Sequence, residues 1–470
     1  MTSRSTRLGV CVGLWVSILV PVQLLAESQP NILLLVSDDQ RPDTVGALGN
    51  QVIRTPHLDA LARQGSVFTR AICANPICTP SRGELLKGCS GFRMGVRDFG
   101  GKFRDGFASL GEVLKKGGYR THYVGKWHNQ GRPDTHGYES VRGLFSGGGG
   151  KWWKDQVDAH GRPVTGYRGW VFQTNDRQMF PEQGVGLTPD ISARFADAAV
   201  ELIQDEDPRP FFIHVNFTAP HDPLLVPPGF ADAYDPAKMP LPANFQPQHA
   251  LDTGNLKGRD ERLLPWPRTA QDVKQDLAVY YAVLTHLDQQ VGRILQALEQ
   301  RKLNDNTLVI YTSDHGLAMG SHGLRGKQNM YEHTINVPLI VRGPGVPRGA
   351  TFGTQLYLRD LYPTVCDFAN VPLVNAVDGH SLRPVLEGAQ ETIYPYVFGY
   401  FRDFQRMVRG KRWKLIHYPQ IGQWQLFDLQ EDPHELRNRV AEQAHQATVD
   451  QLRRELLRWQ RSVSDPVIPQ

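Results

Sequence analysis

The chain contains 470 residues, more than one hydrophobic core usually holds, so we expect one large domain with a smaller companion. Its 52 lysines and arginines nearly balance its 48 aspartates and glutamates, and it has no dense basic block with interleaved aromatic residues. The charge pattern therefore argues against nucleic acid as a partner.

Residues 1–26 have the pattern of a secretory signal peptide. Arg4 and Arg7 precede an apolar run from Leu8 to Ala26, and we expect cleavage near Ala26. The alternative is an uncleaved membrane anchor, although the run is barely long enough to span a bilayer. We therefore predict a secreted or periplasmic protein, attached to a membrane only if this segment is retained.

The first apolar run after this segment ends in two acids. Residues 31–37 have the pattern of a strand buried on both faces, and Asp38 and Asp39 follow at once. Open α/β sheets place their sites at such strand ends. Adjacent carboxylates would repel by a few kcal/mol at about 4 Å in a protein-like dielectric, so we expect a bound cation. Oxygen ligands favour Ca²⁺ or Mg²⁺ over zinc, and N-capping of a following helix is the alternative.

A helix with a cysteine at its start comes next. Thr79 as N-cap and Pro80 as first helical residue predict a helix that begins behind Cys78 and ends at Gly88. Free backbone N–H groups and Arg82 at this end suit an anionic substrate and would lower the thiol pKa. The alternative interpretation is a buried structural cysteine before a capped helix.

Three later predicted strands, 119–124, 210–217 and 308–312, also end in polar side chains. The first two deliver Lys126, His128 and His221. The third delivers Asp314 and His315, and Lys327 follows in a glycine-rich loop. Because Asp314 adds to the negative charge of the acid pair, it strengthens the case for a cation.

Helical patterns separate these strands, at 56–63, 110–116, 189–203 and 277–298. The alternation predicts an α/β domain whose mostly parallel or mixed central sheet is flanked by helices. We place this catalytic domain at 27–375.

Residues 132–187 carry few periodic apolar residues, so we expect a long surface insertion and assign it to substrate contact, with an ordered loop of no role as the alternative. Short strands at 396–401 and 413–417 and a helix at 442–463 predict a small α+β subdomain over 376–470.

Cysteines are too few for a disulfide scaffold. Without Cys11 of the predicted leader, four remain: Cys73, Cys78, Cys89 and Cys366. The sequence does not decide whether any of them pair.

The wording C-T-P-S-R at 78–82, followed by Leu86 and Gly88, resembles the sulfatase signature C-x-P-S-R-x-x-x-L-T-G-R. Lys87 and Cys89 depart from it, in the auxiliary part of the maturation signal. The resemblance implies an alkaline-phosphatase-like fold and a formylglycine that a maturation enzyme makes from the cysteine. The hydrated aldehyde would then attack sulfur, and elimination would expel sulfate.

Further motifs match the family in the same order: G-K-x-H at 125–128, P-H at 220–221 and the lysine at 327. The resemblance implies that His128 assists the formylglycine cycle and that His221 protonates the leaving group, while Lys126 and Lys327 hold the sulfate. It also implies one divalent ion, usually Ca²⁺, with this ligand set: Asp38, Asp39, Asp314, His315 and the formylglycine at position 78.

We therefore predict a sulfatase that acts on a sulfated small molecule or glycan, and export together with the tryptophan-bearing insertion favours a carbohydrate. The alternatives are an arylsulfatase of broad specificity and a phosphonate monoester or phosphodiester hydrolase, which shares the C-x-P-S-R core. A non-enzymatic alternative is an inactive protein that binds sulfated glycans because Lys87 and Cys89 prevent maturation. The intact acids, lysines and histidines argue against it.

Overall fold

The structure is a computed structural model that describes residues 1–2, 9 and 29–468. The signal peptide predicted for residues 1–26 therefore lies almost entirely outside the described residues. Within the described part of the chain, no helix is both long enough and apolar enough to cross a bilayer.

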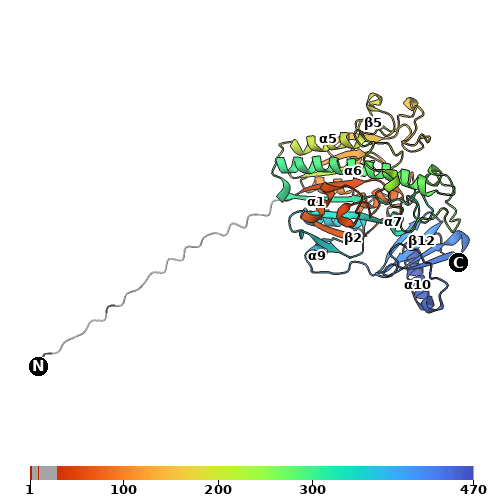
Figure 1. Ribbon diagram of the computed structural model, residues 1–470. Coiled ribbons are helices and arrows are strands. Elements are labelled where there is room, and N and C mark those ends of the chain that lie inside the picture. Colours follow the sequence, from red (N-terminus) through yellow and green to blue (C-terminus); the bar gives the residue numbers. More distant parts are fainter. Residues whose placement is uncertain (3–8, 10–28, 469–470) are drawn as a thin grey trace.

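A ten-stranded mixed sheet forms the centre of the molecule, in the order β10-β2-β8-β7-β1-β6-β3-β4-β5 with β9 paired to β2 (Figure 1). β1, β3, β4, β6 and β7 are parallel neighbours, whereas β8 runs antiparallel to β2 and β7. The strands are β1 Asn31–Ser37, β2 Ser66–Ile72, β3 Arg120–Lys126, β4 Ser140–Ser146, β5 Val171–Phe172, β6 Phe211–Asn216, β7 Thr307–Ser313, β8 Asn336–Arg342, β9 Ala350–Phe352 and β10 Leu356–Tyr357. The predicted α/β class with a mixed central sheet is confirmed.

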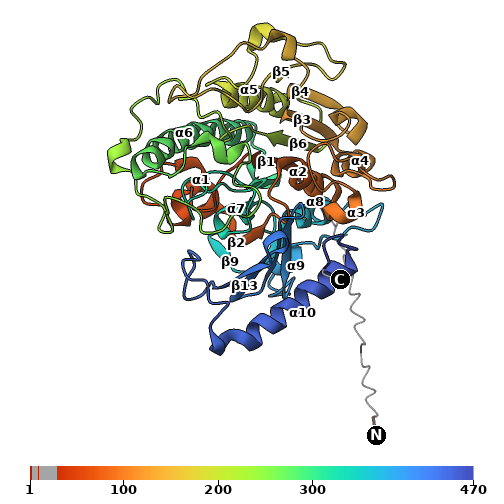
Figure 2. The same cartoon turned by 90° about the vertical axis from the view of Figure 1, so that its right-hand side faces the viewer.

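Helices cover both faces of this sheet (Figure 2). α1, α5 and the long α6 pack on one face, and α2, α4 and α8 pack on the other. The helices are α1 Pro56–Gln64, α2 Cys78–Lys87, α3 Gly91–Met94, α4 Leu110–Lys116, α5 Ile191–Gln204, α6 Ala270–Gln300, α7 Glu332–Ile335, α8 Leu361–Phe368, α9 Arg383–Leu386 and α10 Gln446–Ser462.

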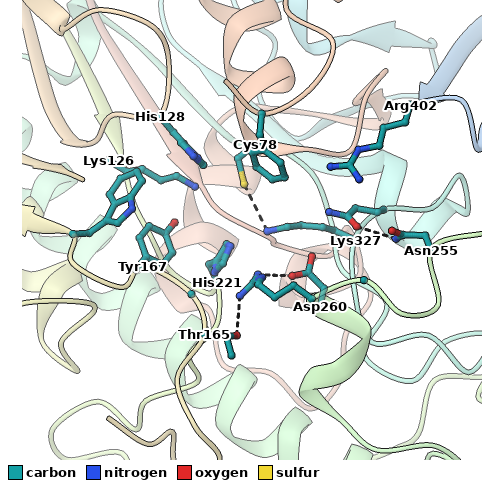
Figure 3. A pocket seen from close by; sticks show the side chains of 16 residues that line it. Cys78, Lys126, His128, Thr165, Tyr167, His221, Asn255, Asp260, Lys327 and Arg402 are labelled. Atoms are coloured by element: carbon teal, nitrogen blue, oxygen red, sulfur yellow. Dashed lines mark hydrogen bonds and ion pairs between the residues drawn. The ribbon is translucent and has the colours of Figure 1, made fainter. Parts of the chain in front are cut away.

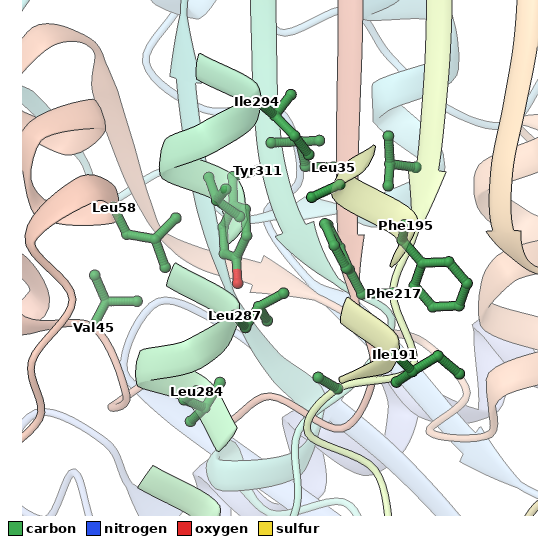
Figure 4. Close-up of a cluster of buried hydrophobic side chains, with 14 of the residues drawn as sticks. Leu35, Val45, Leu58, Ile191, Phe195, Phe217, Leu284, Leu287, Ile294 and Tyr311 are labelled. Atoms are coloured by element: carbon green, nitrogen blue, oxygen red, sulfur yellow. The ribbon is translucent and has the colours of Figure 1, made fainter. Parts of the chain in front are cut away.

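The central strand β1 is buried along its whole length because both of its faces are covered. Its side chains alternate, so that Leu33 and Leu35 join the core under α1, α5 and α6, while Ile32 and Leu34 join the core under α2, α4 and α8. Figure 4 shows Leu35 in the first of these cores. A continuous apolar run is what a parallel strand between two helical layers requires.

Part of the segment 132–187 belongs to the sheet, so its prediction as a surface insertion is wrong there. β4 pairs in parallel with β3, and Phe145 is fully buried. The strand was missed because its first residues are only half-buried, with Arg142 exposed, and because its register with β3 shifts after Val124. Its pattern is therefore neither continuous nor alternating.

The end of the chain forms a small antiparallel sheet of four strands, β11 Val397–Phe401, β12 Gln405–Arg409, β13 Trp413–Tyr418 and β14 Gln423–Asp428. α10 packs Leu452 and Leu456 against Val408 and Leu415 of this sheet. The predicted small α+β unit is thus confirmed as a structure. The domain boundary at residue 375 stays a prediction.

Candidate active site

A cavity of about 350 Å³ opens where the carboxyl ends of β1, β3, β6 and β7 meet (Figure 3). These strands are neighbours in the sheet, so the residues that follow them converge although they lie far apart in sequence. Five of the catalytic residues predicted from sequence line this cavity: Cys78, Lys126, His128, His221 and Lys327.

The helix that carries Cys78 begins earlier than predicted. α2 starts at Cys78 itself, with Ile77 as its N-cap in an extended conformation, so Thr79 is not the cap. Pro80 is tolerated at the third position because the first turn of a helix leaves its N–H groups without intrahelical partners. The helix ends as predicted at Gly88, whose left-handed φ of 66° lets its N–H donate to the carbonyl of Glu84.

The thiol of Cys78 is buried among charged side chains. Its Sγ lies 3.3 Å from His315 Nε2, 3.5 Å from an oxygen of Asp38 and 3.6 Å from Lys327 Nζ. Burial alone would raise the pKa of this thiol, but the charges of Lys126 and Lys327 hold it well below its usual value. The surroundings of Cys78 therefore favour the negatively charged form of its thiol.

Each acid of the pair after β1 is bound to one lysine. Lys126 Nζ donates to Asp38 at 2.6 Å, and Lys327 Nζ donates to Asp39 at 2.8 Å. Asp39 has a φ of 68°, and its backbone N–H donates to Asp314 at 3.2 Å. Aspartate is one of the few side chains that adopts this left-handed conformation readily. The backbone turn therefore brings both carboxylates and the acid after β7 together.

Arg82 lies behind the acids rather than in the lining of the cavity. Its Nε donates to Asp314 at 3.0 Å, one Nη lies 3.4 Å from Asp38, and the other donates to Asn216 at the end of β6. Only 6% of the residue is exposed. The contacts of Arg82 are therefore suited to hold the acids in position and to offset part of their charge.

The two histidines of the cavity have different surroundings. His128 packs its ring between Phe99 and Trp170, with ring centroids 5.8 and 5.1 Å away, and burial lowers its pKa. His221 has Nδ1 3.1 Å from Asp222 and Nε2 3.9 Å from Asp39. Burial alone would lower the pKa of His221, but the neighbouring carboxylates raise it.

Sequence reasoning missed two residues that complete the site. Tyr167 donates its hydroxyl hydrogen to Asp38, and Arg259 donates to both oxygens of Asp222, at 2.5 and 2.9 Å. Both residues come from irregular segments, where no periodicity marks a buried position. The only signal was the assignment of residues 132–187 to substrate contact, because Tyr167 and Trp170 of that segment line the cavity.

Tyr167→Phe is expected to lower kcat/KM about tenfold because it removes one charge-assisted hydrogen bond, typically worth about 1.5–3 kcal/mol, from a buried carboxylate. Steady-state kinetics on a nitrophenyl sulfate measures the loss. Tyr234→Phe, which removes a half-buried hydroxyl outside the cavity, is the matched control. Equal activities of the two variants would show that the Tyr167 hydroxyl does not position Asp38.

Four buried side chains beside the cavity could hold a divalent cation. Asp38, Asp39, Cys78 and His315 each offer one ligand atom, and these atoms all lie within 4.8 Å of one another. Burial raises the pKa of Asp314 to about 7, and the nearby charge of Asp38 adds to the shift. The carboxylate oxygens of Asp38 and Asp39 are ligands that Ca²⁺ and Mg²⁺ prefer.

The remaining described cysteines, Cys73, Cys89 and Cys366, are free and buried. Lys87 donates to the carbonyl of Phe107 at 2.8 Å. Both departures from the signature, Lys87 and Cys89, are therefore buried residues at the end of α2.

The sulfatase family profile matches residues 30–371, and the profile N-sulphoglucosamine sulphohydrolase, C-terminal, matches residues 320–462. An arylsulfatase from Clostridium perfringens is 29% identical over 457 residues, which cover 92% of this chain and 94% of the relative. An N-acetylglucosamine-6-O-sulfatase from Bacteroides thetaiotaomicron is 26% identical over 481 residues, which cover 87% of this chain and 82% of the relative.

Solved structures share the fold. The phosphonate monoester hydrolase of Agrobacterium radiobacter superposes with a TM-score of 0.76 at 25% identity and covers 92% of this chain and 96% of its own. A protein solved in complex with its substrate D-glucosamine-2-N,6-O-disulfate superposes with a TM-score of 0.75 at 24% identity. The match covers 94% of this chain and 99% of that protein. The fold is therefore alkaline-phosphatase-like. Because the family profile spans most of its length, the chain belongs to the sulfatase family and is a sulfuric ester hydrolase.

Proposed function

We propose that the enzyme hydrolyses sulfate esters of a carbohydrate, with a formylglycine made from Cys78 and one divalent ion, Ca²⁺ in preference to Mg²⁺. The observation that carries the proposal is that Cys78, Lys126 and Lys327 line one cavity and that both lysines are bound to a buried acid pair beside it. Such a site binds a tetrahedral anion next to a nucleophile. Secretion or export to the periplasm, and a maturation enzyme as a partner, are part of the same proposal.

The chain's own residues would bind the sulfate group and the leaving alcohol. Lys126 and Lys327 line the cavity with their ammonium groups fixed by the acid pair, so they need no reorganisation when an anion arrives. His221 lies on the same cavity, and its contact with Asp222 fixes the ring for proton donation to the leaving oxygen. His128 faces position 78 and would move a proton there.

A cation fits the acid cluster, and these residues would hold it: Asp38, Asp39, Asp314, His315 and residue 78. A bound Ca²⁺ would supply positive charge next to the sulfate oxygens and would lower the repulsion among the carboxylates. The formylglycine would supply the nucleophile as its hydrated aldehyde. Arg82 would keep the acids in place behind the ion.

A carbohydrate is favoured over a small aryl ester as substrate. The cavity of about 350 Å³ is lined by Trp170 and Phe99 together with the polar groups of Asn255 and Gln328, which suits the mixed faces of a sugar. The relative from Bacteroides thetaiotaomicron is an N-acetylglucosamine-6-O-sulfatase, and an ulvan-active sulfatase from Formosa agariphila is 26% identical over 426 residues.

A panel of sulfated saccharides, assayed for released sulfate beside a nitrophenyl sulfate and a phosphonate monoester, tests this function. We expect the highest kcat/KM on a sulfated sugar. The likeness to a phosphonate monoester hydrolase makes that activity the second candidate. Faster turnover of the phosphonate than of every sulfate ester would reverse the assignment.

Residue 78 is expected to be formylglycine in protein made together with a maturation enzyme, because the C-T-P-S-R core is intact. Mass spectrometry of the peptide that contains residue 78 would show an aldehyde in place of the thiol. Cys366, which is also buried, serves as the internal control and should remain a thiol. Active protein with only unmodified cysteine at position 78 would contradict the proposed chemistry.

A further inference from the structure

A second cavity, of about 570 Å³, lies next to the active site and is rich in arginine. Its lining includes four arginines and one tryptophan: Arg93, Arg97, Arg104, Arg359 and Trp459. We refer to it as the arginine cavity. It forms where α3 meets the C-terminal end of α10, and the rings of Phe92 and Trp459 lie 5.7 Å apart there (Figure 2).

The charges of the arginine cavity are only half compensated. Arg93 is paired with Asp378, and Arg359 is paired with Glu84 at 2.9 Å. Among the described residues, no carboxylate lies within ion-pair distance of Arg97 or Arg104. Two positive charges therefore remain open to an anion from solution.

Arg359, another arginine of the cavity, has a buried N–H donor without a partner among the described residues. Only 8% of Arg359 is exposed, and within the described part of the chain its Nε has no hydrogen-bond partner. A buried donor without a partner costs free energy unless a ligand or water accepts its hydrogen. Arg359 therefore carries one donor that the side chains described around it leave unsatisfied.

The other groups of the cavity suit a sugar. Trp459 offers an apolar ring whose position is fixed by stacking on Phe398 at 5.1 Å, and Ser90, Ser462 and Ser464 contribute hydroxyl-bearing side chains. A sulfate or carboxylate on a sugar ring would bring an anion to the arginines and an apolar face to the tryptophan. A free inorganic anion would use only the first of these.

The two cavities are lined by residues that lie close together in the sequence. Arg97 lines the arginine cavity, Phe99 lines the active-site cavity, and Asp98 between them is paired at 2.8 Å with Arg402, which also lines the active site. Three residues span at most about 10 Å. The linings of the two cavities are therefore close to each other along the chain.

We propose that the arginine cavity binds a second anionic sugar unit of the chain whose sulfate ester lies in the active site. This inference rests on the proposed function and narrows it: the preferred substrate is an oligosaccharide with several sulfate or carboxylate groups. The arginine cavity contributes to binding and not to chemistry, because none of its residues lines the cavity around position 78.

The test compares the Arg97→Ala, Arg104→Ala double variant with the wild type on two substrates, a monosaccharide with one sulfate and an oligosaccharide that carries the same sulfated unit plus further sulfates. We expect KM for the oligosaccharide to rise about tenfold with kcat unchanged, and both constants for the monosaccharide to stay the same. Both arginines are exposed, so the fold should tolerate the change. Arg454→Ala, an exposed arginine of α10 outside both cavities, is the matched control.

A second measurement does not depend on turnover. Titration calorimetry at two salt concentrations measures the affinity of the protein for dextran sulfate. The double variant should bind more weakly than Arg454→Ala and with a smaller salt dependence. Equal KM values and equal dextran sulfate affinities for the two variants would overturn the inference, while turnover by the wild type would leave the proposed function standing. A wild type inactive on every sulfated saccharide would refute the proposed function and the inference with it.

Discussion

Chelation of the proposed divalent ion is expected to abolish turnover, and Ca²⁺ is expected to restore it. The buried carboxylates of Asp38 and Asp39 lie beside position 78, and a metal ion at such a site typically supplies several kcal/mol of charge stabilisation. Because each 1.4 kcal/mol corresponds to a factor of about ten, the loss should be at least about 10³-fold in kcat/KM. Elemental analysis of the dialysed protein measures the ion directly.

Two variants make this experiment specific to the acid pair. Asp38→Asn keeps the shape of the side chain and should lose both the ion and the activity. Asp197→Asn changes an acid on α5 whose side chain is 55% exposed and paired with Arg293, and it should lose neither. Full activity of protein shown by elemental analysis to be free of metal would mean that Lys126, Lys327 and Arg82 balance the acids without an ion.

His221→Ala is expected to lower kcat/KM about 10²- to 10⁴-fold on a sugar sulfate and far less on a nitrophenyl sulfate. A sugar alcohol is a poor leaving group unless it is protonated, whereas an acidic phenol departs as its anion. The side chain lies on the cavity with Nδ1 3.1 Å from Asp222, as a proton donor to the leaving oxygen requires. The measurement is kcat/KM for both substrates, each turned over by the wild type.

The lysine variants are the controls for this test. Lys126→Ala and Lys327→Ala should damage both reactions alike, because the sulfate group is the same in each. Equal losses on the two substrates for His221→Ala would remove it from the role of general acid. His128, the other histidine of the cavity, would then be tested in the same way.

The strands that end at the site could be predicted because a strand buried on both faces consists almost entirely of apolar residues. The run at 31–37 is apolar since helices cover both faces of β1, and the acids that follow it mark the strand end. The C-T-P-S-R motif identified α2 for a different reason, its resemblance to a family signature. The apolar strands and this motif together located most of the predicted catalytic residues that line the cavity.

The remaining wall of the cavity could not be predicted, because its residues come from segments without periodicity. Tyr167 and Arg259 reach the site through tertiary folding of irregular chain, and their contacts with Asp38 and Asp222 join residues that are far apart in sequence. β4 was not predicted because only residues near its end are buried. The helix start was misplaced because Thr79 has the chemistry of a cap, while the backbone gives that position to Ile77.

All ten residues of α2 are buried in the folded chain, and Cys78 is only 1% exposed. Under the proposed chemistry, an enzyme that reads this segment and oxidises its cysteine cannot reach it once the sheet and its helices have closed around it. Conversion therefore competes in time with folding. The specific activity of a preparation is then decided by which process is faster during synthesis, and two samples of identical fold and stability can differ in the fraction of molecules that work.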